Sequence, residues 1–253
     1  MKLSTTLADF KGFVPAWTDA VHMFEGTGFR YLDFDFYNTI YPGSPFLTRD
    51  LKRGVLEAAA AAEETGVTFV QAHSPCYNPM DPSADHETGM LALRRTVEAC
   101  GMLKIQNLVV HSGFTPELRY PQDRDAYFQR AKDFHKSIFP EMEKWGVNVL
   151  IENIDQWNMD GRWYFGSGAE MREFLEYCGH PLLHACWDVG HANIDGRDQY
   201  KEIRDLGREL RGVHIQDNLG AHDDHIAPLM GTLDLDGVML GRRSCQYRRK
   251  RPV

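Results

Sequence analysis

Five polar residues stand where apolar runs of the sequence end, and their types are those that bind metal ions. His73, His111, Glu152, Asp188 and His214 close runs that read VTFVQAH, IQNLVVHSG, VNVLIEN, LLHACWDVGH and VHIQDN. Their separations of 38, 41, 36 and 26 residues each leave room for about one strand and one helix. Imidazole and carboxylate groups together suit Zn²⁺, Mn²⁺, Co²⁺ or Mg²⁺. A fold that gathers these side chains would therefore hold a divalent metal.

The segments between these residues predict helices that alternate with strands. An alanine-rich helix is expected over residues 48–65, with Thr48 as its cap. Glycines end this helix and the later ones, at Gly66, Gly101, Gly146, Gly179 and Gly212. With Leu3–Leu7 and FRYLDFDF, the sequence offers seven candidate strands. Alternation of this kind indicates parallel pairing, because a crossover helix must lead to each new strand.

An open doubly wound sheet and a closed barrel both satisfy that alternation, and the polar strand ends distinguish them. Five strand ends of an open sheet lie along a line that is too long to share one site. In a (β/α) barrel the C-terminal ends of all strands converge on one mouth, where active sites lie. The sequence therefore predicts an α/β fold of the TIM barrel type.

The order of the motifs adds a resemblance to a known family. The succession QAHSP, VVHSG, LIENI, CWDVGH, GVHIQDN and DDHIAPLMGTLD resembles the xylose-isomerase-like (β/α)8 barrel superfamily over roughly residues 1–238. That superfamily includes sugar isomerases and epimerases and the endonuclease IV enzymes. The resemblance implies a metal-dependent isomerase or epimerase of a sugar or sugar derivative, acting through a metal-stabilised enediolate and proton transfer.

The resemblance also implies a role for each matched residue. Glu152, Asp188 and His214 would bind one divalent metal (Mn, Zn, Co or Mg), and Glu152 would be the general base. His191, three residues after Asp188, would bind a substrate hydroxyl. His73 and His111 would bind further hydroxyls. Taken singly, a histidine or glutamate at a strand end is more often a loop cap or a solvated group.

Two alternatives stay open beside the isomerase. Asp223 and His225 either support a loop or provide additional metal ligands. In the latter case the chain matches all but the final glutamate of the endonuclease IV set, which binds three zinc ions and cleaves abasic DNA. That set would comprise His73, His111, Glu152, Asp188, His191, His214, Asp223 and His225. The third hypothesis is a non-catalytic sugar binder.

The resemblance ends after Val238. Family members continue with a helix and an eighth strand that ends in the last metal-binding glutamate. Here the sequence reads MLGRRSCQYRRKRPV, with no carboxylate after Asp236. We expect a barrel over residues 1–240 that lacks its eighth strand, followed by a basic, disordered tail over 241–253, as a truncated or frameshifted gene would give. Activity would be impaired, and a homo-oligomer would cover the open strand edge.

The charge and composition of the chain indicate which kinds of partner it can bind. Residues 241–253 hold six of the 28 basic residues, so residues 1–240 carry 22 basic and all 36 acidic ones, a net charge of −14. Such a body repels a phosphate backbone unless its basic residues gather on one face, so nucleic acid is not the expected partner. The sequence lacks an apolar run of about 18 residues and a signal-peptide pattern. Five scattered cysteines suit reduced thiols. We expect a cytoplasmic protein that acts on a small-molecule sugar and not on membranes.

Overall fold

The structure is a computed structural model. It describes residues 2–10, 13–14, 16–41, 43–44, 47–48, 50–157, 159–162 and 164–249, with side chains up to residue 245. The chain divides into two compact units. The first unit comprises Met1–Val110 and Ser137–Asn148, and the second comprises His111–Lys136 and Val149–Val253.

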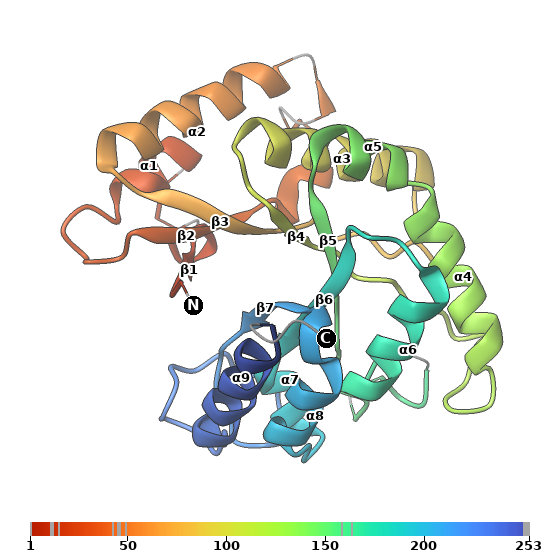
Figure 1. Ribbon diagram of the computed structural model, residues 1–253. Coiled ribbons are helices and arrows are strands. Elements are labelled where there is room, and N and C mark those ends of the chain that lie inside the picture. The colour runs from red at the N-terminus through yellow and green to blue at the C-terminus, as the bar shows by residue number, and fades with distance from the viewer. Residues whose placement is uncertain are drawn as a thin grey trace. The chain divides into compact units, whose positions relative to one another are not determined.

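Strands and helices alternate along the described chain, as predicted (Figure 1). The strands are β1 (Thr5–Thr6), β2 (Tyr31–Asp35), β3 (Thr68–His73), β4 (Asn107–Val109), β5 (Asn148–Glu152), β6 (Leu183–Asp188) and β7 (Leu210–His214). The α-helices are α1 (Trp17–His22), α2 (Leu51–Thr65), α3 (His86–Met102), α4 (Arg124–Lys136), α5 (Phe139–Trp145), α6 (Gly168–Cys178), α7 (Val189–Ile194), α8 (Gln199–Leu206) and α9 (Leu235–Arg249). Short 3-10 helices lie at Leu7–Phe10, Tyr37–Ile40 and Gly207–Glu209. None of the described helices is both long enough and apolar enough to span a membrane.

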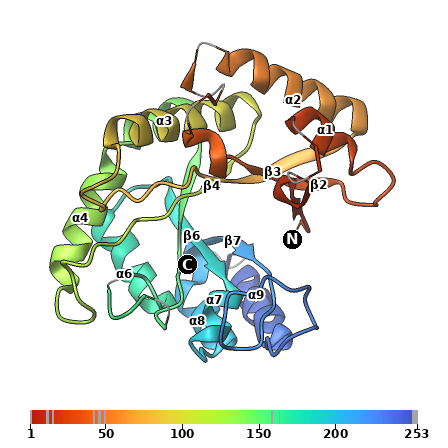
Figure 2. The ribbon, with the colours of Figure 1, turned by 180° about the vertical axis from the view of Figure 1, so that it is seen from behind.

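The first unit pairs its strands in parallel and in chain order. β2 lies between β1 and β3, and β3 pairs with β4. Leu32, Phe34 and Phe36 are fully buried at alternate positions, as expected for one face of a strand. Helix α2 buries Leu51, Val55 and Ala58 at helical spacing and lies beside α1, which Figure 2 shows from behind.

The second unit repeats the same arrangement. β6 pairs in parallel with both β5 and β7, and Glu152, Asp188 and His214 are the last residues of the three strands. Trp187 is fully buried, and its indole nitrogen donates to Gln199 at the start of α8. The parallel α/β prediction is confirmed in both units.

Predicted helix ends agree with the structure where glycine takes a left-handed conformation. Gly66, Gly146 and Gly179 have φ angles of 70°, 65° and 66° and follow the last residues of α2, α5 and α6. Such angles are strained for any residue with a Cβ. The prediction for Gly101 is wrong, because α3 continues to Met102 and Gly101 faces the Trp145 ring.

Two further local predictions also differ from the structure. Thr48 does not cap α2: the cap position is Asp50, and the Thr48 hydroxyl accepts a hydrogen bond from the Asp50 amide. Gly212 does not end a helix, because it lies inside β7. The sequence around Gly212 does not show whether this glycine ends a helix or lies within a strand. Its pairing with Cys186 shows that it belongs to β7.

The C-terminal residues are more ordered than their composition predicted. Residues 241–249 continue α9 and do not form a disordered tail, whereas residues 250–253 lie outside the described residues. Val238, Gly241 and Cys245 lie at helical spacing, and α9 packs beside α8 (Figure 1). A Cβ on Gly241 would lie 2.9 Å from Ile203, and the Cys245 thiol donates to the Ile203 carbonyl. The arginine-rich composition of this segment predicted a tail, although Val238, Gly241 and Cys245 form an apolar face that packs on α8. Among the described residues after β7, the structure has no further strand.

Candidate functional site

Three predicted site residues come together at the ends of β5, β6 and β7 in the second unit. Register places Glu152 opposite Cys186, and Asp188 opposite His214. Glu152 and Asp188 are each only 2% exposed. Buried carboxylates are costly unless they are paired, so the neighbours of these two determine what the site can do.

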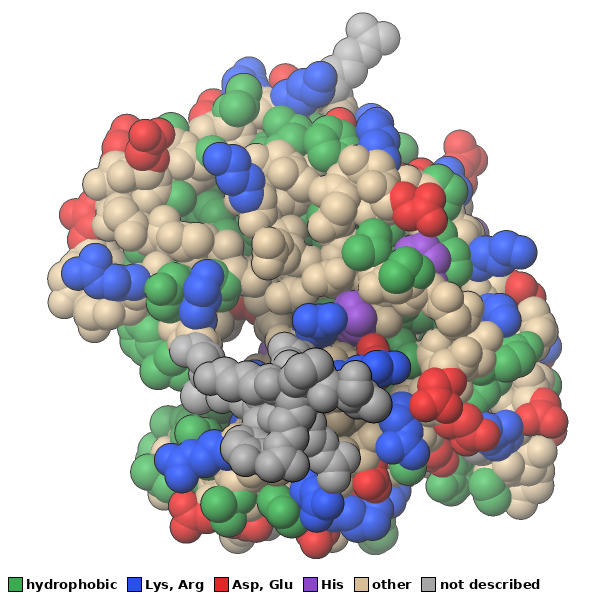
Figure 3. Space-filling model, viewed as in Figure 1, with side chains coloured by type: hydrophobic (Ala, Val, Ile, Leu, Met, Phe, Trp, Pro, Cys, Tyr) green, Lys and Arg blue, Asp and Glu red, His purple; other side chains and the backbone are tan. Residues whose placement is uncertain are grey.

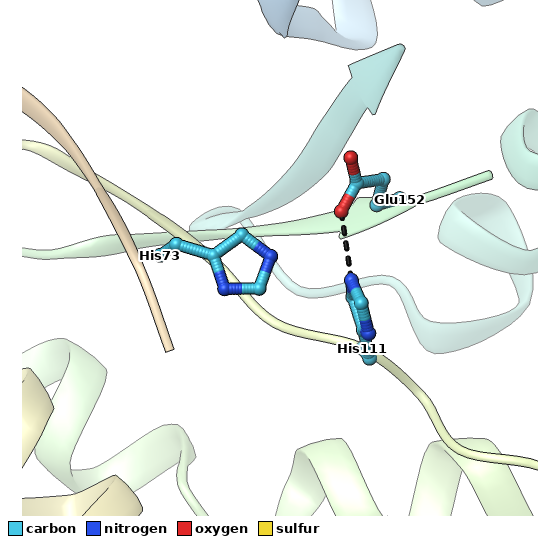
Figure 4. A group of neighbouring side chains, drawn as sticks. All are labelled: His73, His111 and Glu152. Atoms are coloured by element: carbon cyan, nitrogen blue, oxygen red, sulfur yellow. Dashed lines mark hydrogen bonds and ion pairs between the residues drawn. The ribbon is translucent and has the colours of Figure 1, made fainter. Parts of the chain in front are cut away.

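The Glu152 carboxylate is held between two imidazole rings. Its Oε1 lies 2.5 Å from Nδ1 of His214. Its Oε2 lies 2.8 Å from Nε2 of His111, the contact that Figure 4 draws as a dashed line. Nδ1 of His214 is also 4.0 Å from Oδ2 of Asp188. Burial lowers the pKa of His214, but Cys186 and Glu152 beside it outweigh burial and raise that pKa well above the ordinary value. Each carboxylate oxygen therefore faces its own imidazole ring.

His191 is positioned by the turn that follows β6. Asp188 is the N-cap of α7, and its Oδ1 accepts a hydrogen bond from the His191 amide at 2.9 Å. Nδ1 of His191 donates to the Asn153 carbonyl at 2.8 Å, so Nε2 is the nitrogen that faces Asp223, at 3.5 Å. Burial lowers the pKa of His191, and Asp188 and Asp223 more than offset this and raise it to about 10. We call Glu152, Asp188, His191 and His214 the strand-end cluster.

Asn153 ties β5 to β6 and was missed in the sequence. Its Oδ1 accepts from the Asp188 amide at 2.7 Å, and its Nδ2 donates to the Asp188 carbonyl at 2.9 Å. The two bonds fix the backbone that carries Asp188 relative to Glu152. The sequence does offer an indication: Asn153 directly follows Glu152 at the end of an apolar run, where a buried amide side chain needs a hydrogen-bond partner.

Gln216 is a second missed residue. Its Nε2 donates to Oδ1 of Asp223 at 2.6 Å and lies 3.4 Å from Oδ1 of Asp188. Its Oε1 is a buried oxygen with no hydrogen-bond partner among the described residues. The side chain lies over Gly190, where an added Cβ would be 1.9 Å from Nε2. The sequence signal was weak: an amide two residues after His214, on the same face of an extended chain.

Asp223 and His225 lie on a loop that Asp217 organises. The Asp217 carboxylate accepts backbone hydrogen bonds from Asn218, Leu229, Gly231 and Leu233, at 2.8 to 3.1 Å. Burial raises the pKa of Asp217, and these amides outweigh that effect and lower it. Nε2 of His225 lies 3.0 Å from Oδ2 of Asp223. This loop brings Asp223 to His191, while His225 remains 63% exposed at its side chain.

The last predicted residue, His73, lies in the first unit. It ends β3, is half-buried, and pairs with Asp35 in the register of the two strands. Its Nδ1 lies 3.1 Å from the Ser74 carbonyl oxygen. The strand-end position is as predicted, and its role in a site stays a prediction.

The donor types of the strand-end cluster fit a divalent cation. Ligand atoms of Glu152, Asp188 and His191 lie within 4.8 Å of one another, and so do those of Glu152, Cys186 and His214. Carboxylate oxygens and imidazole nitrogens are ligands of Zn²⁺ and Mn²⁺, and a cation among them would offset the buried negative charge.

Comparison with known proteins identifies the family. The sequence pattern of the xylose isomerase-like TIM barrel family matches residues 24–240. The chain belongs to this family. The TIM barrel prediction and the resemblance seen in the motifs are therefore confirmed.

Solved structures of the same fold include sugar epimerases. The chain is similar to a D-tagatose 3-epimerase-like protein, with a TM-score of 0.76 and 18% identity over 96% of this chain and 86% of that one. It is also similar to the 3-keto-D-glucoside 4-epimerase YcjR of E. coli, with a TM-score of 0.75 and 20% identity over 97% and 88%. A D-psicose 3-epimerase gives a TM-score of 0.74 at 17% identity over 98% and 82%. At these identities the likeness concerns the fold.

Relatives found by sequence are uncharacterized proteins. One from Sinorhizobium fredii is 23% identical over 188 residues, which are 74% of this chain and 56% of the relative. Another, from Methanocaldococcus jannaschii, is 23% identical over 218 residues, 82% of this chain and 70% of the relative. The chain thus spans little more than half the length of the first relative.

Proposed function

We propose that the protein is a divalent-metal-dependent isomerase or epimerase of a sugar or sugar derivative. The observation that carries the proposal is the buried Glu152 carboxylate, held between His111 and His214 with Asp188 beside it. Sugar epimerases among the solved structures of the same fold support the substrate class.

Glu152, Asp188 and His214 would hold the cation. When bound, a divalent cation draws electrons from a substrate carbonyl and so acidifies the neighbouring C–H. Oε1 of Glu152 faces His214, on the side of Asp188, which leaves Oε2 to accept the proton from that carbon as general base.

The remaining histidines would handle protons and hydroxyls. Nε2 of His111 contacts Oε2 of Glu152, and its side chain is 35% exposed, so it can pass the abstracted proton to or from solvent. His191, whose Nδ1 donates to the Asn153 carbonyl and whose Nε2 faces Asp223, would bind a substrate oxygen. Gln216 keeps Asp223 and Asp188 in place through its amide group.

A multi-zinc phosphodiesterase is the second candidate, favoured by one observation. Asp223 lies within 3.5 Å of His191 and 3.0 Å of His225, so the loop offers further ligands beside the cluster. Lys and Arg side chains are interspersed with acidic and apolar ones on the described face that Figure 3 shows, and do not form one band there. The net charge of −14 over residues 1–240 favours a small sugar over a nucleic acid.

The experiment is proton exchange in heavy water together with metal analysis. Purified protein is loaded with Mn²⁺, Co²⁺ or Zn²⁺ and incubated with D-fructose, D-tagatose and D-psicose, while NMR follows the C–H beside the carbonyl. We expect one ion per chain and exchange of that hydrogen for deuterium, both lost in Asp188→Asn. Two or three ions per chain with cleavage of abasic DNA would select the phosphodiesterase. A folded, metal-loaded protein that exchanges no ketose hydrogen and cleaves no DNA would overturn both enzymes.

A further inference from the structure

Cys186 lies beneath the strand-end cluster and has no part in the function proposed above. It is fully buried in β6, two residues before Asp188, so both side chains lie on the same face of the strand. Register sets it opposite Glu152 on β5 and opposite Gly212, two residues before His214, on β7. A thiol therefore points to the space between Glu152 and His214.

The distances are those of a ligand set. The Cys186 sulfur, a Glu152 carboxylate oxygen and a His214 ring nitrogen all lie within 4.8 Å of one another. Oδ2 of Asp188 lies 4.0 Å from Nδ1 of His214 and extends the set by one more oxygen. Sulfur, nitrogen and carboxylate oxygen are all donor types that bind Zn²⁺, and a catalytic site keeps one further position for a substrate oxygen.

We propose that Cys186 is a metal ligand, and that its sulfur makes this a site for Zn²⁺ or Co²⁺ in preference to Mg²⁺ or Mn²⁺. The inference rests on the metal site of the proposed function and adds to it the class of metal. Thiolate sulfur is a soft ligand that binds Zn²⁺ strongly, whereas Mg²⁺ and Mn²⁺ prefer oxygen. As the metal–sulfur bond forms, the thiol proton leaves to the buffer.

Cobalt spectroscopy tests the sulfur ligand directly. Wild type, Cys186→Ser and Cys178→Ser are stripped of metal and titrated with Co²⁺ alone. Cys178 is the matched control, because it lies on α6 in the same unit and belongs to neither donor group of the site. We expect a near-ultraviolet sulfur-to-cobalt charge-transfer band in wild type and Cys178→Ser, complete at one equivalent, and none in Cys186→Ser. The Zn²⁺ dissociation constant should rise at least about tenfold in Cys186→Ser, with little change for Mn²⁺.

The outcomes separate this inference from the proposed function. Visible cobalt d–d bands without a charge-transfer band in wild type would show that Cys186 is not a ligand, while the proposed metal site would still be supported. A charge-transfer band that persists in Cys186→Ser would lead to the same conclusion. Absence of stoichiometric Co²⁺ binding in wild type would remove both.

A second measurement needs no variant, so it holds even if Cys186→Ser does not fold. X-ray absorption on wild-type protein loaded with one equivalent of Zn²⁺ should reveal one sulfur at about 2.3 Å from the metal. A shell of nitrogen and oxygen alone would overturn the inference.

Discussion

The second unit contains two buried regions of opposite character. The strand-end cluster buries carboxylates against imidazoles. The aromatic core, which we define as Tyr127, Phe128, His135, Phe165 and Phe174, buries rings against rings, with centroids 4.8 to 6.0 Å apart around Phe174. Both regions are largely buried, yet only the first retains charge.

The histidines show what this difference means. In the cluster, carboxylates raise the pKa of His191 to about 10 despite burial. In the aromatic core, burial without a charged partner lowers the pKa of His135 to about 3. Burial alone thus yields a neutral packing residue, whereas burial with converging opposite charges yields groups that can hold a proton or a cation.

The largest effect expected is on turnover. Glu152→Gln keeps the shape of the side chain and removes its basic oxygen, so sugar exchange should fall by about 10²–10⁴-fold while the circular dichroism spectrum is unchanged. The control is Glu209→Gln, which alters a part-buried carboxylate–imidazole pair, Glu209 with Nδ1 of His184 at 2.9 Å. Equal activity in the two variants would show that the strand-end cluster is no more functional than an ordinary ion pair.

The aromatic core should respond in stability and not in activity. Phe174 is fully buried against Phe128 and Phe165, so Phe174→Ala should cost about 3–5 kcal/mol in the free energy of unfolding by urea. Tyr177→Ala, on the exposed side of the same helix, should cost less than about 1 kcal/mol. Loss of turnover per folded Phe174→Ala molecule would mean that the two regions are coupled.

A glycine substitution tests the packing that supports the cluster. Gly190→Ala places a Cβ against Gln216 and should destabilise the fold by about 1–3 kcal/mol. Gly54→Ala is the control, because Gly54 lies inside α2, where the nearest atom to a new Cβ is 3.9 Å away. This variant should raise the free energy of unfolding by about 0.5–1 kcal/mol. A Gly190→Ala protein as stable as wild type would show that Gln216 is free to move from its position over Gly190.

The remaining prediction concerns the slope of stability against pH. From pH 6.5 down to about 3, His135 takes up a proton in the unfolded chain but not in the folded one. The free energy of unfolding should therefore fall as pH is lowered, by up to about 1.4 kcal/mol per pH unit from this residue. His135→Gln should reduce that slope in urea titrations between pH 6.5 and 4.5. Identical slopes would indicate that His135 is protonated in the folded state and that the core, like the cluster, holds a charge.

Much of the fold followed from local sequence. Apolar runs predicted the strands, glycines at left-handed positions predicted three helix ends, and the polar residue closing each run predicted where side chains would gather. These features depend on neighbours within a few residues, so the sequence contains them directly.

Other features depended on segments that are distant in the chain. Cys186 reads as an ordinary apolar strand residue until register sets it opposite Glu152, and Gln216 has no role until Gly190 and Asp223 are beside it. The four backbone amides that donate hydrogen bonds to Asp217 include that of Leu233, 16 residues along the chain. The stripe that packs α9 on α8 was likewise hidden within an arginine-rich segment.

By itself, then, the sequence determined the α/β class, the family and the strand-end positions of the polar residues. The tertiary structure decided which of those side chains lie within hydrogen-bonding distance of one another. It also decided which neighbouring groups set their charge. The reason is physical. Parallel strands meet through backbone hydrogen bonds whose register is fixed by side-chain packing across dozens of residues, and a pKa depends on every charge that this packing brings near.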